Sequence, residues 1–129
     1  MVQYPKMREE LLETLRSLAD REYQHKVWID KDYSLGIECD SFDDAVHFLY
    51  DDTVLAENQD AAIGVIIKNE KEARLMEAVC QAIDLVFEVL GTEASDEEYI
   101  KSSEWTGVVE AASKALQAME SKAQKAVEV

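Results

Sequence analysis

The sequence predicts an all-α fold, a bundle of four main helices plus one short helix, with a possible short extended segment near 61–67. Apolar residues recur at spacings of three and four over long stretches, which is the period of amphipathic helices. The 129 residues include one proline and four glycines, and few segments suit a strand. A chain of this length makes one ordinary domain, so we expect a single helical domain over 1–129.

The first helix is expected over about 5–20, and it could continue through Tyr23. Pro5 suits a first helical position, where its missing N–H costs nothing. The apolar stripe of this helix is Met7, Leu11, Leu15 and Leu18. Its other face is expected to meet solvent and carries Lys6, Arg8, Glu9, Glu13 and Arg16.

The second helix is expected over about 42–51, after a loop or short extended piece at 28–40 that loses the helical period. Ser41 precedes the new apolar pattern, and Asp44 follows three residues later. This spacing is that of a capping box, with Asp in place of the usual Glu or Gln. The expected inner face is Phe42, Ala45, Val46 and Leu49.

The middle of the chain is expected to hold a turn and then an ambiguous apolar run. "TVLAENQD" at 53–60 is turn-like, and "AAIGVII" at 61–67 suits either a short buried strand or a packed connection.

The third helix, about 69–90, should be the most buried element. Asn69 and Glu72 form its start signal and Gly91 its C-terminal cap. The core stripe contains Cys80 among apolar residues and no inward Glu, while Leu75, Ala82 and Val89 add apolar surface on a second side.

Two further helices follow. Ser95 and Glu98 have capping-box spacing, which predicts one short helix. A last helix is expected over about 103–120, with Trp105, Val108 and Met119 on its apolar stripe. The final "SKAQKAVEV" either continues this helix or frays.

The charge balance restricts the class of partner. Twenty-eight acidic residues against thirteen basic ones give a net charge of −15 and a pI of about 4.4. Such a surface repels nucleic acid and anionic lipid, so we expect neither as a partner. It favours a cationic partner, or serves only colloidal solubility.

The chain is expected to be cytoplasmic. Its first residues are polar and lead into a helix, without the pattern of a signal peptide. Its longest apolar run, 61–67, is too short to span a membrane. Cys39 and Cys80 are therefore expected to be free thiols, with Cys80 a small buried hydrophobe.

The segment 30–41, "DKDYSLGIECDS", has the alternating acids of a calcium loop but not its key positions. An EF-hand needs Gly at its sixth position and Glu at its twelfth, where this chain has Leu35 and Ser41. We therefore expect no calcium site.

Catalysis has little support in the sequence. Neither a phosphate-binding glycine loop nor a nucleophile motif occurs, so we expect no cofactor and no enzyme. The alternative is a metal-binding bundle enzyme that uses two carboxylate-x-x-His pairs, Glu22 with His25 and Asp44 with His47.

An acidic segment with interleaved aromatics is the main candidate for function. Between 30 and 52 the chain has eight carboxylates and one basic residue, Lys31. Asp43 and Asp44, at the start of the second helix, interact favourably with its macrodipole. Asp51 and Asp52, at its end, interact unfavourably with it, and acids placed against this local preference hint at a function. The expected partner-binding residues are Trp28, Tyr33, Asp40, Asp43, Asp44, Tyr50, Asp51 and Asp52.

Three stretches together carry a family resemblance: "MREELLETLRSLADREYQ", "FDDAVHFLYDDT" and "YIKSSEWTGVVEAASKALQAM". They resemble a family of small acidic bacterial proteins of mostly unassigned function, similar to the immunity proteins of contact-dependent and polymorphic toxin systems. The resemblance implies an antidote that occludes one cognate toxin domain. Many such toxins are nucleases with basic clefts, which an anionic surface can fill. A generic helical adaptor that forms a homodimer through the apolar excess around 61–67 is a further alternative.

Overall fold

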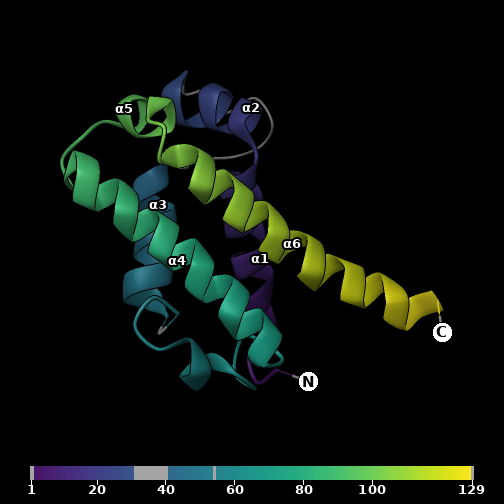
Figure 1. Ribbon diagram of the computed structural model, residues 1–129. Coiled ribbons are helices and arrows are strands. Elements are labelled where there is room, and N and C mark those ends of the chain that lie inside the picture. Colours follow the sequence, from purple (N-terminus) through teal and green to yellow (C-terminus); the bar gives the residue numbers. More distant parts are fainter. Residues whose placement is uncertain (1, 31–40, 54, 129) are drawn as a thin grey trace.

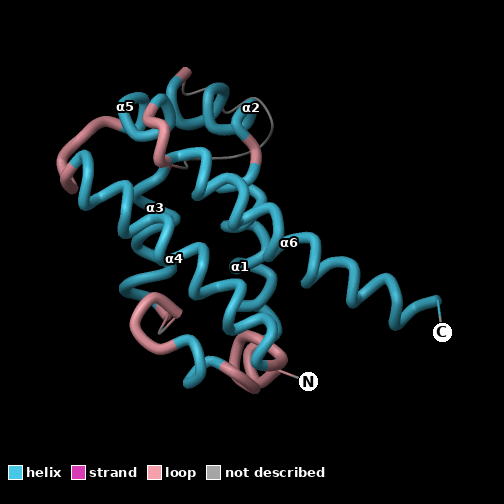
Figure 2. Tube along the Cα trace, in the orientation of Figure 1, coloured by secondary structure: helices cyan, strands magenta, loops and turns pink. Residues whose placement is uncertain are grey.

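The computed structural model describes residues 2–30, 41–53 and 55–128, with side chains as far as Glu120. It confirms the all-α fold, and no regular strand occurs in these ranges (Figures 1 and 2). The elements follow one another as α1 (Pro5–Ala19), α2 (Arg21–Tyr23), η1 (Gln24–Ile29), α3 (Phe42–His47), η2 (Phe48–Asp52), η3 (Gln59–Ala62), α4 (Glu70–Leu90), α5 (Asp96–Lys101) and α6 (Trp105–Glu128).

Four long rods make the bundle: α1, α3 continued by η2, α4, and α6. Helix α6 packs along both α1 and α4, and α1 packs against α3. Helix α4 is joined to η2 by a hydrogen bond from the Tyr50 hydroxyl to the Asp84 carboxylate, with the Cys80 carbonyl oxygen 3.3 Å from the same hydroxyl. The order around the bundle is therefore α1, α3–η2, α4, α6. It places the α1–α3 face and the α4–α6 face on opposite sides of the molecule (Figure 1).

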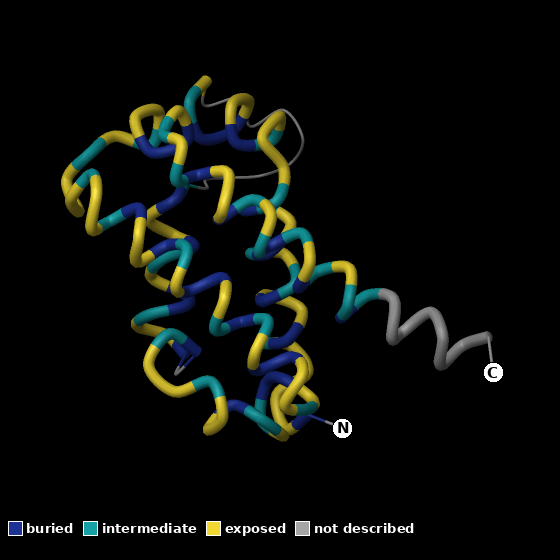
Figure 3. The backbone as a smooth tube through the Cα atoms, in the orientation of Figure 1, coloured by how far each residue is buried: buried dark blue, intermediate teal, exposed yellow. Residues whose placement is uncertain are grey.

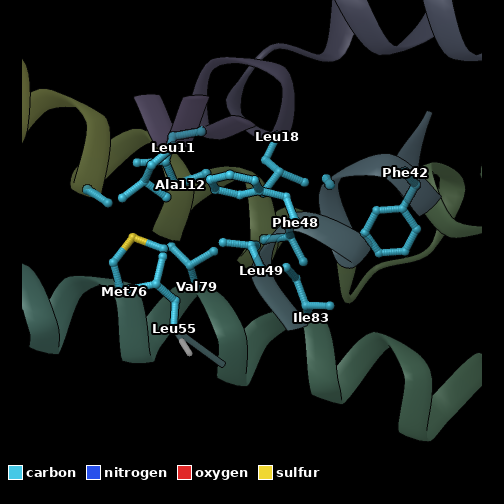
Figure 4. Packing of buried hydrophobic residues seen from close by; sticks show 14 of the residues in the cluster. Leu11, Leu18, Phe42, Phe48, Leu49, Leu55, Met76, Val79, Ile83 and Ala112 are labelled. Atoms are coloured by element: carbon cyan, nitrogen blue, oxygen red, sulfur yellow. The ribbon is translucent and has the colours of Figure 1, made fainter. Parts of the chain in front are cut away.

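One continuous core fills the bundle, and Figure 3 shows its buried positions turned inward on every rod. Figure 4 shows Leu11 and Leu18 of α1 facing Met76, Val79 and Ile83 of α4 across the interior. These residues belong to the apolar stripes expected from the sequence.

Phe42 is the centre of an aromatic cluster at one end of the core. Its ring centroid lies 4.9 Å from that of Trp105 and 5.1 Å from that of Tyr99, both edge-on. Trp28 and Phe87 complete the cluster at 6.1 and 5.6 Å. Edge-on pairs of this kind add about 0.5–1.5 kcal/mol each beyond the area they bury.

The expected caps are present. Ser41 Oγ accepts a hydrogen bond from the Asp44 N–H at 3.3 Å, and Asn69 Oδ1 accepts one from the Glu72 N–H at 2.9 Å. Ser95 and Glu98 form a full capping box. These bonds satisfy N–H groups that have no partner within the helix, which fixes where each helix begins.

The first helix ends at Asp20 rather than running through Tyr23. The backbone is extended at Asp20, whose carboxylate accepts a bond from the Tyr23 N–H at 3.1 Å and so starts α2. The chain then stays helical to Ile29, where the sequence predicts a loop from 28. Gln24 explains why the chain is helical over 24–29. Its side chain donates to the Leu18 carbonyl oxygen and accepts from Trp105 Nε1 at 2.9 Å, which fixes the start of this stretch against α1 and α6.

The segment 61–67 is neither a strand nor a long helix. It begins with the last two residues of the short 3-10 helix η3 and continues as a turn with an isolated bridge between Ile63 and Ile67. Gly64 has a φ of 84°, a conformation that residues with a Cβ avoid. Ile66 and Ile67 are buried, so this run does not supply the exposed apolar surface expected of a homodimer.

Arg8 is not on the solvent face where the sequence predicts it. Its guanidinium is buried and forms a two-bond ion pair with Glu72, at 2.8 Å from Nη1 to Oε1 and 2.9 Å from Nη2 to Oε2. Glu72 faces inward too, contrary to the expectation that α4 has no inward Glu. Its Oε1 also accepts from the Lys68 N–H at 2.7 Å, so the pair joins α1 to the start of α4.

Candidate functional site

A groove of about 620 Å³ lies between α1 and α3. The carboxylates along it are Glu10, Glu13, Asp20 and Asp44, against one guanidinium, that of Arg16. Its apolar lining comes from Ala45, Phe48 and Tyr23. The groove therefore combines a dense negative charge with a small apolar lining, in which Tyr23 is half-buried and Phe48 is 8% exposed.

Helix geometry explains how the α1 wall arises. Glu10, Glu13, Ser17 and Asp20 are spaced by three, four and three residues, so they share one face of the helix. The hydroxyls of Thr14 and Ser17 donate back to the carbonyl oxygens four residues earlier, at 2.9 and 3.1 Å, and so are held close to the backbone. The acidic side chains and Arg16 are then the longest groups that α1 contributes to the groove.

The acids of the groove have little compensating charge. Among the described residues, no basic group lies within ion-pair distance of the carboxylates of Glu10, Glu13 or Asp44. Arg16, which lines the same groove, is held by Glu120 at 2.7 Å. Like charges gathered along a low-dielectric wall raise the local negative potential and attract cations.

The acidic surface continues along α3 and η2. Asp43 and Asp44 occupy the first turn of α3, and both are exposed. Asp51 and Asp52 lie at the end of η2, where His47 Nδ1 is 2.7 Å from Asp51 and Nε2 is 3.9 Å from Asp52. One helical rod thus presents these four carboxylates to solvent.

Tyr50 is turned toward α4 instead of toward a partner. Its hydroxyl donates to Asp84 at 2.5 Å, and burial together with this bond raises the pKa of Tyr50. Burial and then Asp84 raise the pKa of the neighbouring Cys80 thiol to about 12. Both groups therefore stay protonated near neutral pH, so neither is an activated base or nucleophile.

The other predicted partner-binding residues have different outcomes. The prediction for Trp28 is wrong: it is 1% exposed and packs between Phe42 and Trp105, because its large ring completes the aromatic cluster. Tyr33 and Asp40 lie outside the described residues. The α1 acids were not among the predicted residues, although their spacing along one helix face is visible in the sequence.

The chain matches one family model over residues 2–127, described as a domain of unknown function, DUF7945. It belongs to this family. No curated protein and no solved structure matches it.

The two carboxylate-x-x-His pairs do not build a metal centre in the described part of this DUF7945 domain. Glu22 and His25 are exposed on α2 and η1, and Asp44 and His47 are exposed on α3. Across the described residues, no three His, Cys, Asp or Glu side chains come together as metal ligands. The calcium-like segment lies outside the described residues apart from its two ends. No described helix is both long enough and apolar enough to cross a membrane.

Proposed function

We propose that this DUF7945 domain is a cytoplasmic immunity protein that binds and occludes a cationic toxin domain of nuclease type. The binding surface is the α1–α3 face, with Glu10, Glu13 and Asp44 in the groove and Asp51 and Asp52 along η2. The observation that carries the proposal is the groove itself, whose acids have almost no basic neighbours and stand next to aromatic surface.

The chemistry of the groove suits lysine and arginine side chains. Its volume of about 620 Å³ is within the usual range of ligand pockets, about 300–1,000 Å³, and exceeds that of one such side chain. The carboxylates pair with the cationic head group, and Phe48 and Ala45 cover its apolar stem. A nuclease cleft carries basic groups that bind the phosphates of its substrate. A row of carboxylates can pair with the same basic groups and so take the positions of the phosphates.

The charge distribution also predicts the kinetics. Exposed carboxylates speed the encounter with a basic partner and select partners of positive charge. Aromatic area buried at the interface sets the lifetime of the complex. Association should therefore be fast and should slow when salt is added.

The test uses the toxin domain encoded beside the gene, in a cell-protection assay and in titration calorimetry. The Glu10→Gln, Glu13→Gln, Asp44→Asn variant removes three charges from the groove. Its matched control, Glu57→Gln, Glu93→Gln, Glu110→Gln, removes three exposed charges outside it. We expect the groove variant to lose about 100-fold or more in affinity together with protection, because truncating one partner of a charge pair costs about 2–5 kcal/mol. Equal binding by both variants would refute the proposal.

A further inference from the structure

We infer that the exposed side of α4 binds a second copy of this chain as an antiparallel helix pair. This surface lies on the α4–α6 face, opposite the acidic groove, and the inference does not depend on the proposed function. It begins from Leu85 and Val89, which are 48% and 54% exposed and are among the most exposed large apolar side chains of the described residues.

Helix α4 carries two apolar stripes, and the bundle uses one of them. Met76, Val79, Ile83 and Val86 are fully buried in the core. The second stripe, called the α4 seam from here on, is Leu75, Ala78, Ala82, Leu85 and Val89. Its members are half-buried or exposed, and they alternate at spacings of three and four, the heptad pattern of helices that pair with another helix. A helix that only had to join the bundle would need no such stripe.

Charge complementarity identifies the occupant as a second copy. When two α4 seams pack antiparallel, Leu75 faces the partner's Leu85 and Ala78 faces the partner's Ala82. One edge of the seam carries Arg74, Gln81 and Glu88, which are seven residues apart. In this register Gln81 lies opposite the partner's Gln81. Arg74 then lies opposite the partner's Glu88, and Glu88 opposite the partner's Arg74, which makes two reciprocal ion pairs. In a parallel arrangement Arg74 would lie nearest the partner's Val79, which is buried in the core, and neither ion pair would form.

The surroundings of the seam favour this contact. Ala78 and Ala82 are small, so the two helix axes can approach closely. On the neighbouring α6, Gly107 is exposed and Ala111 half-buried, so this helix does not block the approach. Arg74 already contacts Asp60 and Glu77, and its exposed guanidinium has donors for a further carboxylate.

The overall charge of the protein opposes self-association, and this pairing minimises the opposition. The seam itself contains no acidic residue, and Lys71 and Arg74 stand at one end of it. The carboxylates of the groove lie on the far side of each copy. At about 0.15 M salt the screening length is about 8 Å, so their mutual repulsion across the dimer is weak.

The experiment is sedimentation velocity on the full chain at about 5–500 µM, a range suited to an interface of one helix pair. We expect a monomer–dimer equilibrium for the wild type and at least tenfold weaker association for Leu85→Glu. Arg74→Glu and Glu88→Lys should each associate at least tenfold more weakly, because each creates two like-charge contacts. Mixed in equal amounts, these two variants should form a heterodimer, since one contact then pairs the glutamate introduced at position 74 with the lysine introduced at position 88, and the other keeps the native pairing of Glu88 with Arg74.

Circular dichroism of each variant establishes that it is folded, and the mixture serves as an internal control because it contains the same two proteins. A wild type that stays monomeric at the highest concentration would overturn the inference. So would a Leu85→Glu protein that dimerises like the wild type, or a mixture that associates no better than either variant alone.

Discussion

The buried ion pair between Arg8 and Glu72 gives the sharpest stability prediction. Replacing Glu72 with Met leaves the Arg8 guanidinium, whose side chain is 11% exposed, with only the Ile66 carbonyl oxygen at 3.1 Å. Replacing Arg8 with Met removes both guanidinium bonds from the Glu72 carboxylate, whose side chain is 1% exposed. A buried charge without its partner costs about 3–5 kcal/mol. Each single variant should therefore lose a large part of a total stability of about 5–15 kcal/mol.

The magnitudes of the two single changes should differ. Arg8 retains some access to water, so Glu72→Met should cost about 3 kcal/mol. Glu72 has almost none, so Arg8→Met should cost about 5 kcal/mol.

The double variant isolates the interaction. With both charges replaced by apolar side chains of similar length, the desolvation cost also disappears, and the double change should cost no more than about 1 kcal/mol. Urea unfolding followed by circular dichroism gives the free energy of unfolding of all four proteins from their midpoints at constant m. Costs that simply add in the double variant, or single costs below about 1 kcal/mol, would refute the reasoning, because the pair would then contribute no coupling.

Three further predictions concern local features. Gly91→Ala should cost about 1–3 kcal/mol in urea unfolding, since φ 81° and ψ 177° lie in a region essentially restricted to glycine; an unchanged midpoint would contradict this. Ser41→Ala should lower the unfolding free energy by about 1 kcal/mol by removing the α3 cap, while Ser41→Asp should restore it. In a Cys39→Ser background, Cys80 should not react with a thiol reagent at pH 8 until denaturant is added. Because the Cys80 pKa is raised from 9.0 to about 12, the unfolded state loses this proton first. The free energy of unfolding should then fall by about 1.4 kcal/mol per pH unit between these two values. Cys80→Ala should remove this slope between pH 9.0 and 10.0 and reduce it above pH 10.0, where the raised pKa of Tyr50 contributes a slope of the same sign.

The helices were predictable because their signals are local. Ser41, Asn69 and Gly91 mark helix ends through bonds within one turn, and each expected helix begins within a few residues of its predicted start. The last helix continues to Glu128, beyond its expected end near 120. The turn over 24–29 was missed because its cause is distant in sequence. Gln24 is held by Trp105, which is 81 residues away.

The candidate site was only partly predictable. The α3–η2 acids form a dense cluster along the sequence, which a reading of local composition detects. Glu10, Glu13 and Asp20 are interspersed with basic residues on α1, and only the packing of α1 against α3 places them opposite Asp44. The surface position predicted for Trp28 is wrong because aromatics near acids suit both an interface and a core, and sequence spacing does not separate the two.

Binding of a cationic chain at the α1–α3 face is the central claim, and an NMR titration of the labelled domain with an arginine-rich peptide tests it most directly. The account predicts amide shifts at Glu10, Glu13, Asp44 and Phe48, their loss in the Glu10→Gln, Glu13→Gln, Asp44→Asn variant, and their retention in the matched control. Shifts that centre on Leu85 and Ala111, or that persist in the groove variant, would contradict it.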